Sequence, residues 1–252
     1  ILGFAYFIIP VIIEKKMKLV FLIALVVIPF LIFLTGERSN FIKSIFISFS
    51  VLFYFRNIIS IKTILFSFLI FLILIFVSLT SLEKVLNRQK IIFDQIYNSY
   101  QSGEFKKNSK HFLHYDAAIN IINNKTWTGV GNKNYRYACL EINKNLKITE
   151  RFSIYYICST HPHNFYLEQI SEHGIVVFGI LFFSLMLFLL KLNFRCLKYN
   201  RVPIFSLLYI LAVLIPILPN GRFFGTTNAT LFFLHLSYCY FFYKSLSIKK
   251  KL

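Results

Sequence analysis

Long apolar runs separated by short polar segments dominate the chain. A helix rises about 1.5 Å per residue, so an apolar run of about twenty residues can cross a hydrocarbon core about 30 Å thick. Several of the runs are shorter, and these need tilted helices or long polar side chains at their ends. The pattern predicts about seven transmembrane helices, at residues 1–13, 19–35, 41–55, 61–82, 174–190, 203–218 and 229–245.

One long polar segment, Glu83 to His173, interrupts these runs. Between residues 112 and 122, apolar side chains recur every three or four residues, which predicts an amphipathic helix. We therefore expect an all-α polytopic membrane protein with one large external loop that contains short amphipathic helices. The expected divisions are residues 1–82 with four spans, the first truncated, the loop at 83–173, and residues 174–252 with three spans and a basic tail.

Basic residues gather on one side of this predicted topology. The loops at residues 14–18, 56–62 and 191–201 and the tail at 244–252 are rich in Lys and Arg, whereas the two short loops on the opposite side hold only Arg38 and Arg222. Cytoplasmic loops carry an excess of Lys and Arg. We therefore expect a cytoplasmic C-terminus and place the long loop outside.

Composition supports a membrane protein. Hydrophobic residues make up 57% of the 252 residues, with 31 Phe, and the mean hydropathy is +0.64, which is more than a soluble domain of this length carries. The net charge of +18 would suggest nucleic acid in a soluble protein, but here it follows from the basic loops, so we expect no nucleic-acid partner. The chain opens at Ile1 inside an apolar run without signal-peptide features, and we expect it to be the C-terminal part of a longer protein.

Two of the four cysteines, Cys139 and Cys158, fall in the external loop, while Cys196 and Cys239 fall at or near the cytoplasmic side. Only the external pair lies where oxidation is favoured. Sequence alone does not establish connectivity, so a Cys139–Cys158 disulfide and two unpaired thiols remain alternatives.

Two arginines and a pair of histidines come to the external side from distant parts of the chain. Arg38 lies in TGERS, and Arg222 lies in PNGR. A guanidinium near hydrocarbon is costly, and its planar fork suits phosphate oxygens, so each arginine is a candidate binding residue. The alternative for both is a side chain that snorkels to the membrane interface.

His161 and His163 flank Pro162, and Asn164 can cap a helix that begins at Phe165. A histidine at a helix entrance can act as a general base near neutral pH, and the helix N-terminus favours an anionic group. A structural, hydrogen-bonded pair is one alternative. A metal site is another, but no Cys, Asp or further His lies nearby with the usual ligand spacing, and we expect no metal.

Glu168 and Glu172 stand one helical turn apart, so they share a face. Either can orient a histidine or bind a sugar hydroxyl, and solvated carboxylates at a membrane surface are the alternative. The glycine-containing run TGVGN at residues 128–132 lacks the strand, lysine and helix of a nucleotide-binding loop. We interpret it as a tight turn.

The run from His161 to Gly174, HPHNFYLEQISEHG, resembles the histidine motif of the O-antigen ligase and O-antigen polymerase superfamily. Three further elements agree with that family in order and in side of the membrane. TGERS around Arg38 resembles its arginine motif, TGVGNKNY resembles its Gly-x-Gly turn, and PNGRFFG resembles its late external loop.

The resemblance implies a glycosyltransferase that needs no metal or cofactor. Such an enzyme takes glycan from an undecaprenyl diphosphate donor at the periplasmic face of the bacterial inner membrane. The acceptor is lipid A core for a ligase or the growing glycan for a polymerase, and this choice stays open. By motif matching, the catalytic residues are His163, as the base, with His161 and Glu172, and the substrate-binding residues are Arg38, for the diphosphate, with Arg222 and Asn164.

Two other classes of protein compete with the enzyme. A transporter or flippase of surface-polysaccharide precursors would carry polar residues within its spans and broken helices in paired halves. Here the spans are almost wholly apolar and the candidate site is external. A noncatalytic scaffold would make the convergence of Arg38, His163 and Arg222 accidental, so we expect an O-antigen ligase-like glycosyltransferase.

Overall fold

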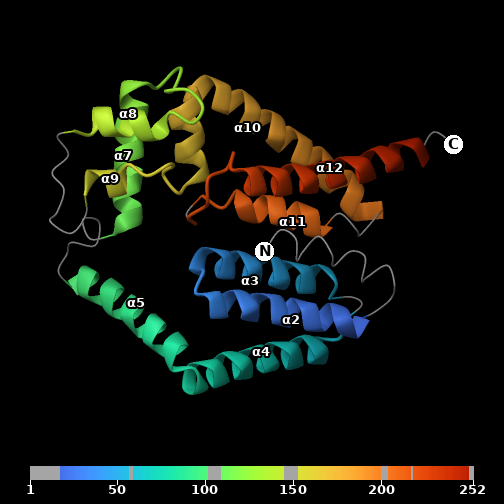
Figure 1. The fold of residues 1–252 in the computed structure, drawn as a ribbon. Helices are drawn as coiled ribbons and strands as arrows, with labels where there is room; N and C mark the ends of the chain where they lie inside the picture. Colours follow the sequence, from blue (N-terminus) through green and yellow to red (C-terminus); the bar gives the residue numbers. More distant parts are fainter. Residues whose placement is uncertain are drawn as a thin grey trace. The chain divides into compact units, whose positions relative to one another are not determined.

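The computed structural model describes residues 18–56, 59–101, 109–144, 153–199, 204–216 and 218–249. Every regular element in these ranges is an α-helix (Figure 1), which confirms the all-α prediction. The helices are α2 (Lys18–Thr35), α3 (Arg38–Tyr54), α4 (Ile61–Ser81), α5 (Glu83–Gln101), α7 (Lys110–Asn124), α8 (Tyr135–Ile142), α9 (Ile154–Ile157), α10 (Phe165–Tyr199), α11 (Ile204–Val213) and α12 (Thr226–Lys249).

Two helical stretches, Ile61–Ser81 and Phe165–Leu192, have the length and apolar composition that a membrane crossing requires. Val20–Thr35 and Ile204–Val213 are apolar but shorter. The expected span at residues 1–13 lies outside the described residues. Each of the other expected spans overlaps a helix, but a total of about seven membrane crossings stays a prediction.

The chain divides into two compact units, which we describe separately. The first unit consists of Ile1–Ile92, Lys191–Leu214 and Thr230–Leu252, and the second consists of Phe93–Leu190 and Ile215–Ala229.

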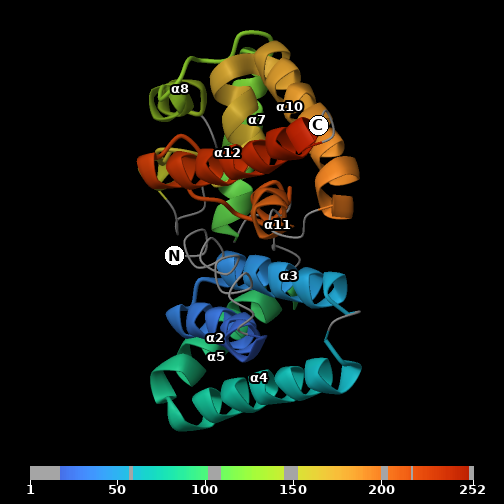
Figure 2. The same ribbon diagram turned by 90° about the vertical axis from the view of Figure 1, so that its right-hand side faces the viewer.

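In the first unit, α2, α3 and α4 lie alongside one another (Figures 1 and 2), and α3 also packs on α11. Its core is built around the rings of Phe21, Phe55 and Phe205, whose centroids lie 5.8 to 6.3 Å apart. Large apolar side chains on α4, such as Phe66 and Phe76, are exposed. A helix that is apolar on its outer face suits a lipid environment.

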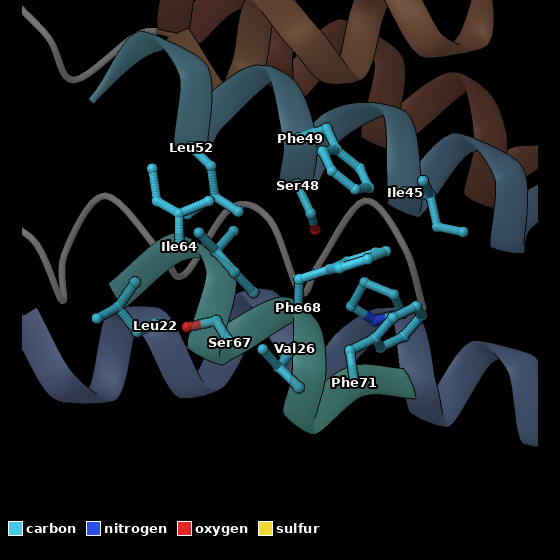
Figure 3. Close-up of a pocket in the computed structure, with 12 residues that line it drawn as sticks. Leu22, Val26, Ile45, Ser48, Phe49, Leu52, Ile64, Ser67, Phe68 and Phe71 are labelled. Carbon is cyan, nitrogen blue, oxygen red and sulfur yellow. The ribbon is translucent and has the colours of Figure 1, made fainter. Parts of the chain in front are cut away.

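A small apolar cavity lies between α2, α3 and α4 (Figure 3). Ser48 and Ser67 are the polar residues of its lining, and both are buried. The other lining residues are Leu22, Leu25, Val26, Pro29, Ile45, Phe49, Leu52, Ile64, Phe68 and Phe71.

The second unit has its own small core, formed by α7, α8 and α9. Buried side chains of α7, among them Leu113, Ala117 and Ile121, pack against Tyr135 of α8 and Ile157 of α9. The helix expected around residues 112–122 is therefore present, as α7. The structure contains a Cys139–Cys158 disulfide, which joins α8 to the end of α9 and is one of the two alternatives that the sequence left open.

Helix α10 is interrupted at Gly174, whose φ of 75° and ψ of 166° are not helical. A side chain here is excluded, because a Cβ would meet the backbone carbonyl of Trp127. The expected tight turn docks at this kink: Val130 N–H donates to the carbonyl of Ser171 at 2.9 Å, and Gly131 N–H donates to that of Glu172 at 2.8 Å. The turn thereby supplies hydrogen-bond donors to carbonyls that have no donor within the interrupted helix.

Candidate functional site

The histidine motif leads directly into α10 within the second unit. The Oδ1 atom of Asn164 accepts hydrogen bonds from the N–H groups of Tyr166 and Leu167, at 3.0 and 3.2 Å, which confirms the expected helix cap. Its Nδ2 donates to the carbonyl of Pro216 at 2.7 Å. Asn164 therefore fixes the start of α10 and also holds the segment that precedes Arg222.

His163 has a left-handed backbone, with φ of 57°. This conformation is uncommon for a residue with a side chain, and such residues gather at functional sites. The N–H of Asn220 donates to the carbonyl of His163 at 2.8 Å and holds the backbone there. The late loop at residues 219–225 is thus attached to the histidine motif.

Four imidazole rings form a cluster with His163 in its middle. The ring centroid of His163 lies 4.2 Å from that of His161, 4.9 Å from that of His114 and 5.9 Å from that of His111. His111 and His114 come from α7, more than 45 residues earlier in the chain. Helix α7 therefore brings two histidines to the motif that supplies the other two.

The pKa of His161 differs from that of an exposed imidazole. Burial lowers its pKa to about 4, and the electrostatic influence of His163, Arg222 and His114 acts in the same direction. A backbone hydrogen bond involving Asn220 opposes these effects. His161 is therefore neutral at physiological pH.

The two glutamates of the motif hold the late loop. Both oxygens of Glu168, which is fully buried, accept the N–H of Phe223, at 3.0 and 3.1 Å. Glu172 forms an ion pair with Arg222, at 3.5 Å between Oε1 and Nη2, with the Glu172 side chain buried and the Arg222 side chain 24% exposed. The two carboxylates therefore position Arg222 and its neighbour Phe223.

The arginine motif lies in the first unit. Helix α2 ends at Thr35, Gly36 takes a φ of 75°, and Arg38 is the exposed first residue of α3. Arg88 of α5 donates from Nη1 to the carbonyl of Thr35 at 2.6 Å, and its guanidinium fills the space that a side chain on Gly36 would need. Arg88 of α5 therefore contacts the turn that leads into Arg38, and the sequence analysis singled out only Arg38.

The structure brings together five of the six predicted site residues: His161, His163, Asn164, Glu172 and Arg222. Arg38 belongs to the other unit, so its convergence with His163 stays a prediction.

Sequence reasoning missed His111 and His114, although their three-residue spacing on an expected helix was an available signal. Ligand spacing along the chain indicated no further histidine beside His161 and His163, whereas the fold brings His111 and His114 to them. The described residues contain no group of three or more His, Cys, Asp or Glu side chains arranged to hold a metal ion.

Comparison with known proteins places this site in a family. We found no match among curated proteins and none among solved structures. A family model described as O-antigen ligase matches residues 21–183, a range that includes Arg38, the turn at Gly129 and the whole histidine motif. The chain therefore belongs to the O-antigen ligase family, within the superfamily of O-antigen ligases and polymerases, and has the membrane-associated, glycan-transferring function of that superfamily in general.

Proposed function

We propose that this protein transfers glycan from an undecaprenyl diphosphate donor to an acceptor hydroxyl at the periplasmic face of the inner membrane. The acceptor is lipid A core if the protein is a ligase, or a growing glycan if it is a polymerase. One observation carries the proposal: His163 lies in the middle of an imidazole cluster at the start of α10, attached to the loop that holds Arg222.

In the proposed reaction, the acceptor oxygen attacks the anomeric carbon of the donor glycan. The new carbon–oxygen bond forms as the bond from that carbon to the diphosphate oxygen breaks, and His163 takes the proton of the acceptor hydroxyl. Negative charge develops on the leaving diphosphate. Arg38 binds this group and stabilises its charge through the planar fork of its guanidinium, so the reaction needs no metal ion.

The remaining residues support these two groups. His161 stays neutral and offers a polar ring beside His163. The Glu172–Arg222 pair carries no net charge, which suits contact with sugar hydroxyls better than with a diphosphate. Asn164 was predicted to bind substrate. Its side-chain amide is hydrogen-bonded to the protein backbone through both Oδ1 and Nδ2, which supports a positioning role at the start of α10.

The Cys139–Cys158 disulfide supports a periplasmic location for the second unit, because structural disulfides persist in oxidising compartments such as the bacterial periplasm. With the basic loops on the opposite side, the C-terminus is then cytoplasmic.

The proposal is tested by complementing a null strain with the full-length gene and comparing lipopolysaccharide ladders at matched membrane expression. His163→Asn is the sharper variant, because asparagine tolerates the left-handed backbone that alanine resists. We expect His163→Asn to reduce transfer by about 10²-fold or more. Arg38→Ala should reduce it strongly, and Arg38→Lys should restore part of it, because lysine keeps the charge and loses the fork.

Arg136→Ala is the matched control, since Arg136 is an exposed arginine of α8 outside the site. Attached single repeats in the variants would indicate a defective polymerase, and accumulated lipid-linked polymer would indicate a defective ligase. Full activity of both His163→Asn and Arg38→Ala would refute the proposed site.

A further inference from the structure

Helix α10 has different surroundings on the two sides of its kink. From Phe165 to Gly174 every residue is buried or half-buried. From Ile175 to Leu190 large apolar side chains are exposed, among them Ile180 at 64% and Phe183 at 68%. Ser184 in this second half donates its hydroxyl to the carbonyl of Ile180 at 2.7 Å, so this polar group does not require water. The second half is about 24 Å long at 1.5 Å per residue, which covers most of a hydrocarbon core.

The turn that docks at the kink carries Trp127. The N–H of Ile175 donates to the carbonyl of Thr126 at 2.9 Å, and the carbonyl of Trp127 lies where a Cβ on Gly174 would be. These contacts fix the backbone of Trp127 at the point where the exposed apolar half of α10 begins. The Trp127 side chain itself is 71% exposed.

The turn around Trp127 is basic. Residues 125–133, KTWTGVGNK, include Lys125 and Lys133, which are both exposed, and contain no acidic residue. The amphipathic ring of a tryptophan favours the headgroup level of a bilayer. A lysine beside it can extend its ammonium group to lipid phosphates. The chemistry of the turn therefore fits a membrane surface.

A sugar ring is another partner that an exposed indole can bind, but the position of Trp127 does not favour it. His163 directly precedes the start of α10, and the stretch from Phe165 to Gly174 is about 14 Å long at 1.5 Å per residue. Helix α7 likewise runs from His111, which contacts His163, to Asn124 just before the docked turn. Trp127 is therefore at the opposite end of both helical stretches from the histidine cluster.

We propose that the turn at residues 125–133 anchors the second unit at the membrane surface. The Trp127 indole lies in the headgroup region of the bilayer, and Lys125 and Lys133 lie against lipid phosphates. The kink at Gly174 marks the boundary between the headgroups and the hydrocarbon. The anchor fixes the depth of α10 and thereby the height of the histidine motif above the hydrocarbon. This inference rests on the membrane association of the family and does not depend on His163 as the base.

Tryptophan fluorescence measures the depth of Trp127. The full-length protein is reconstituted in vesicles of phosphatidylethanolamine and phosphatidylglycerol, and the spectrum of Trp127→Phe is subtracted from that of the wild type. Because the side chain is exposed, phenylalanine should leave the fold unchanged. We expect lipid brominated near the headgroup to quench the difference emission more than lipid brominated near the end of its chains.

Tyr155→Trp, made in the Trp127→Phe background, is the matched control. Tyr155 is 68% exposed and lies on α9, at the same end of the second unit as the histidine cluster, because the carbonyl of Ile157 on α9 contacts His114. We expect aqueous iodide to quench this tryptophan strongly and brominated lipid to quench it little. Trp127 should show the opposite pattern.

The two lysines are tested by a double variant, Lys125→Gln with Lys133→Asn, in which asparagine tolerates the left-handed backbone of position 133. In vesicles with phosphatidylglycerol, iodide should quench Trp127 more in this variant than in the wild type, because the turn has lost its attraction to anionic lipid. An unchanged quenching profile would overturn the assignment of the lysines to lipid phosphates.

Thiol alkylation of the Cys139–Cys158 pair reports whether each variant keeps the fold of the second unit. Equal lipid quenching of Trp127 and of the tryptophan at position 155 would overturn the anchor. So would strongest quenching by lipid brominated at the chain end, or a Trp127 emission that responds only to added lipid-linked glycan. If His163→Asn retained full transfer while Trp127 lay at headgroup depth, the proposed function would fail and this inference would stand.

Discussion

The two units of the chain are held together in different ways. In the first unit, the interior consists mainly of aromatic and aliphatic side chains such as Phe21, Phe55 and Phe205, although the buried His235 and Ser206 are hydrogen-bonded at 2.9 Å. The second unit buries more charged and amide groups, and several of them are hydrogen-bonded individually, such as His114 to the carbonyl of Ile157 and Glu168 to the N–H of Phe223. The disulfide belongs to the second unit as well.

This difference predicts in which unit the loss of a single side-chain atom lowers stability most. Apolar cores tolerate substitutions that conserve volume, since dispersion and burial are spread over many contacts. A buried hydrogen bond is different, because removing one partner leaves the other without compensation. The second unit should therefore lose more stability from small changes, and the following experiments test that contrast in order of expected size.

Replacing Cys139 and Cys158 together by alanine should have the largest effect. Closing a loop of 19 residues is expected to stabilise the fold by about 3 kcal/mol. We expect a clear loss of thermal stability in the detergent-solubilised full-length protein, followed as the fraction that stays monodisperse after heating. Cys239→Ala, which alters a buried cysteine of the first unit, is the control, and an equal loss there would contradict the comparison.

The kink of α10 gives a matched pair of glycines on one helix. Gly174→Ala should destabilise the protein by about 2 kcal/mol, because φ is 75° and the new Cβ would meet the Trp127 carbonyl. Gly179→Ala should be neutral or slightly stabilising, since nothing lies within 4 Å of its Cβ position and alanine favours a helix. Equal melting temperatures of the two variants would show that the kink at Gly174, where the turn docks, does not contribute to the stability of the protein.

The cap of α10 should give a smaller effect. Asn164→Ala removes the acceptor for two backbone N–H groups and should cost about 1 kcal/mol. Asn164→Asp keeps a cap oxygen but lacks the N–H that bonds Pro216, so it should be intermediate in the same heating assay. If aspartate were as damaging as alanine, the bond to Pro216 would matter more than the cap.

The parts of the molecule that were predictable from sequence are those set by neighbours in the chain. Apolar runs located helices, because a helix reflects local periodicity. Asn164 before an apolar segment indicated a cap, and the glycines at 129 and 131 indicated a tight turn, since both signals depend on local backbone geometry. Helix α7 was expected around residues 112–122 for the same reason.

The parts that were missed depend on contacts between distant residues. His111 and His114 meet His163 only because α7 packs beside the motif. Glu168 was expected to share a face with Glu172, but its partner, the N–H of Phe223, lies 55 residues away. No local pattern specifies such a pairing, and the connectivity of Cys139 was open for the same reason.

A pH titration should show the smallest of these effects, and it sharpens the comparison because it concerns one ring of the second unit. The pKa of His161 is lowered from its ordinary 6.5 to about 4, mainly by burial. Between these values the unfolded chain binds a proton that the folded protein does not, so this ring's contribution is complete above pH 6.5 and is lost as the pH falls toward 4. The effect is modest because the ring is only partly buried. His161→Gln should flatten the fall in thermal stability between pH 6.5 and 4 relative to wild type, whereas parallel curves would mean that His161 titrates normally and that carboxylates alone cause the acid loss.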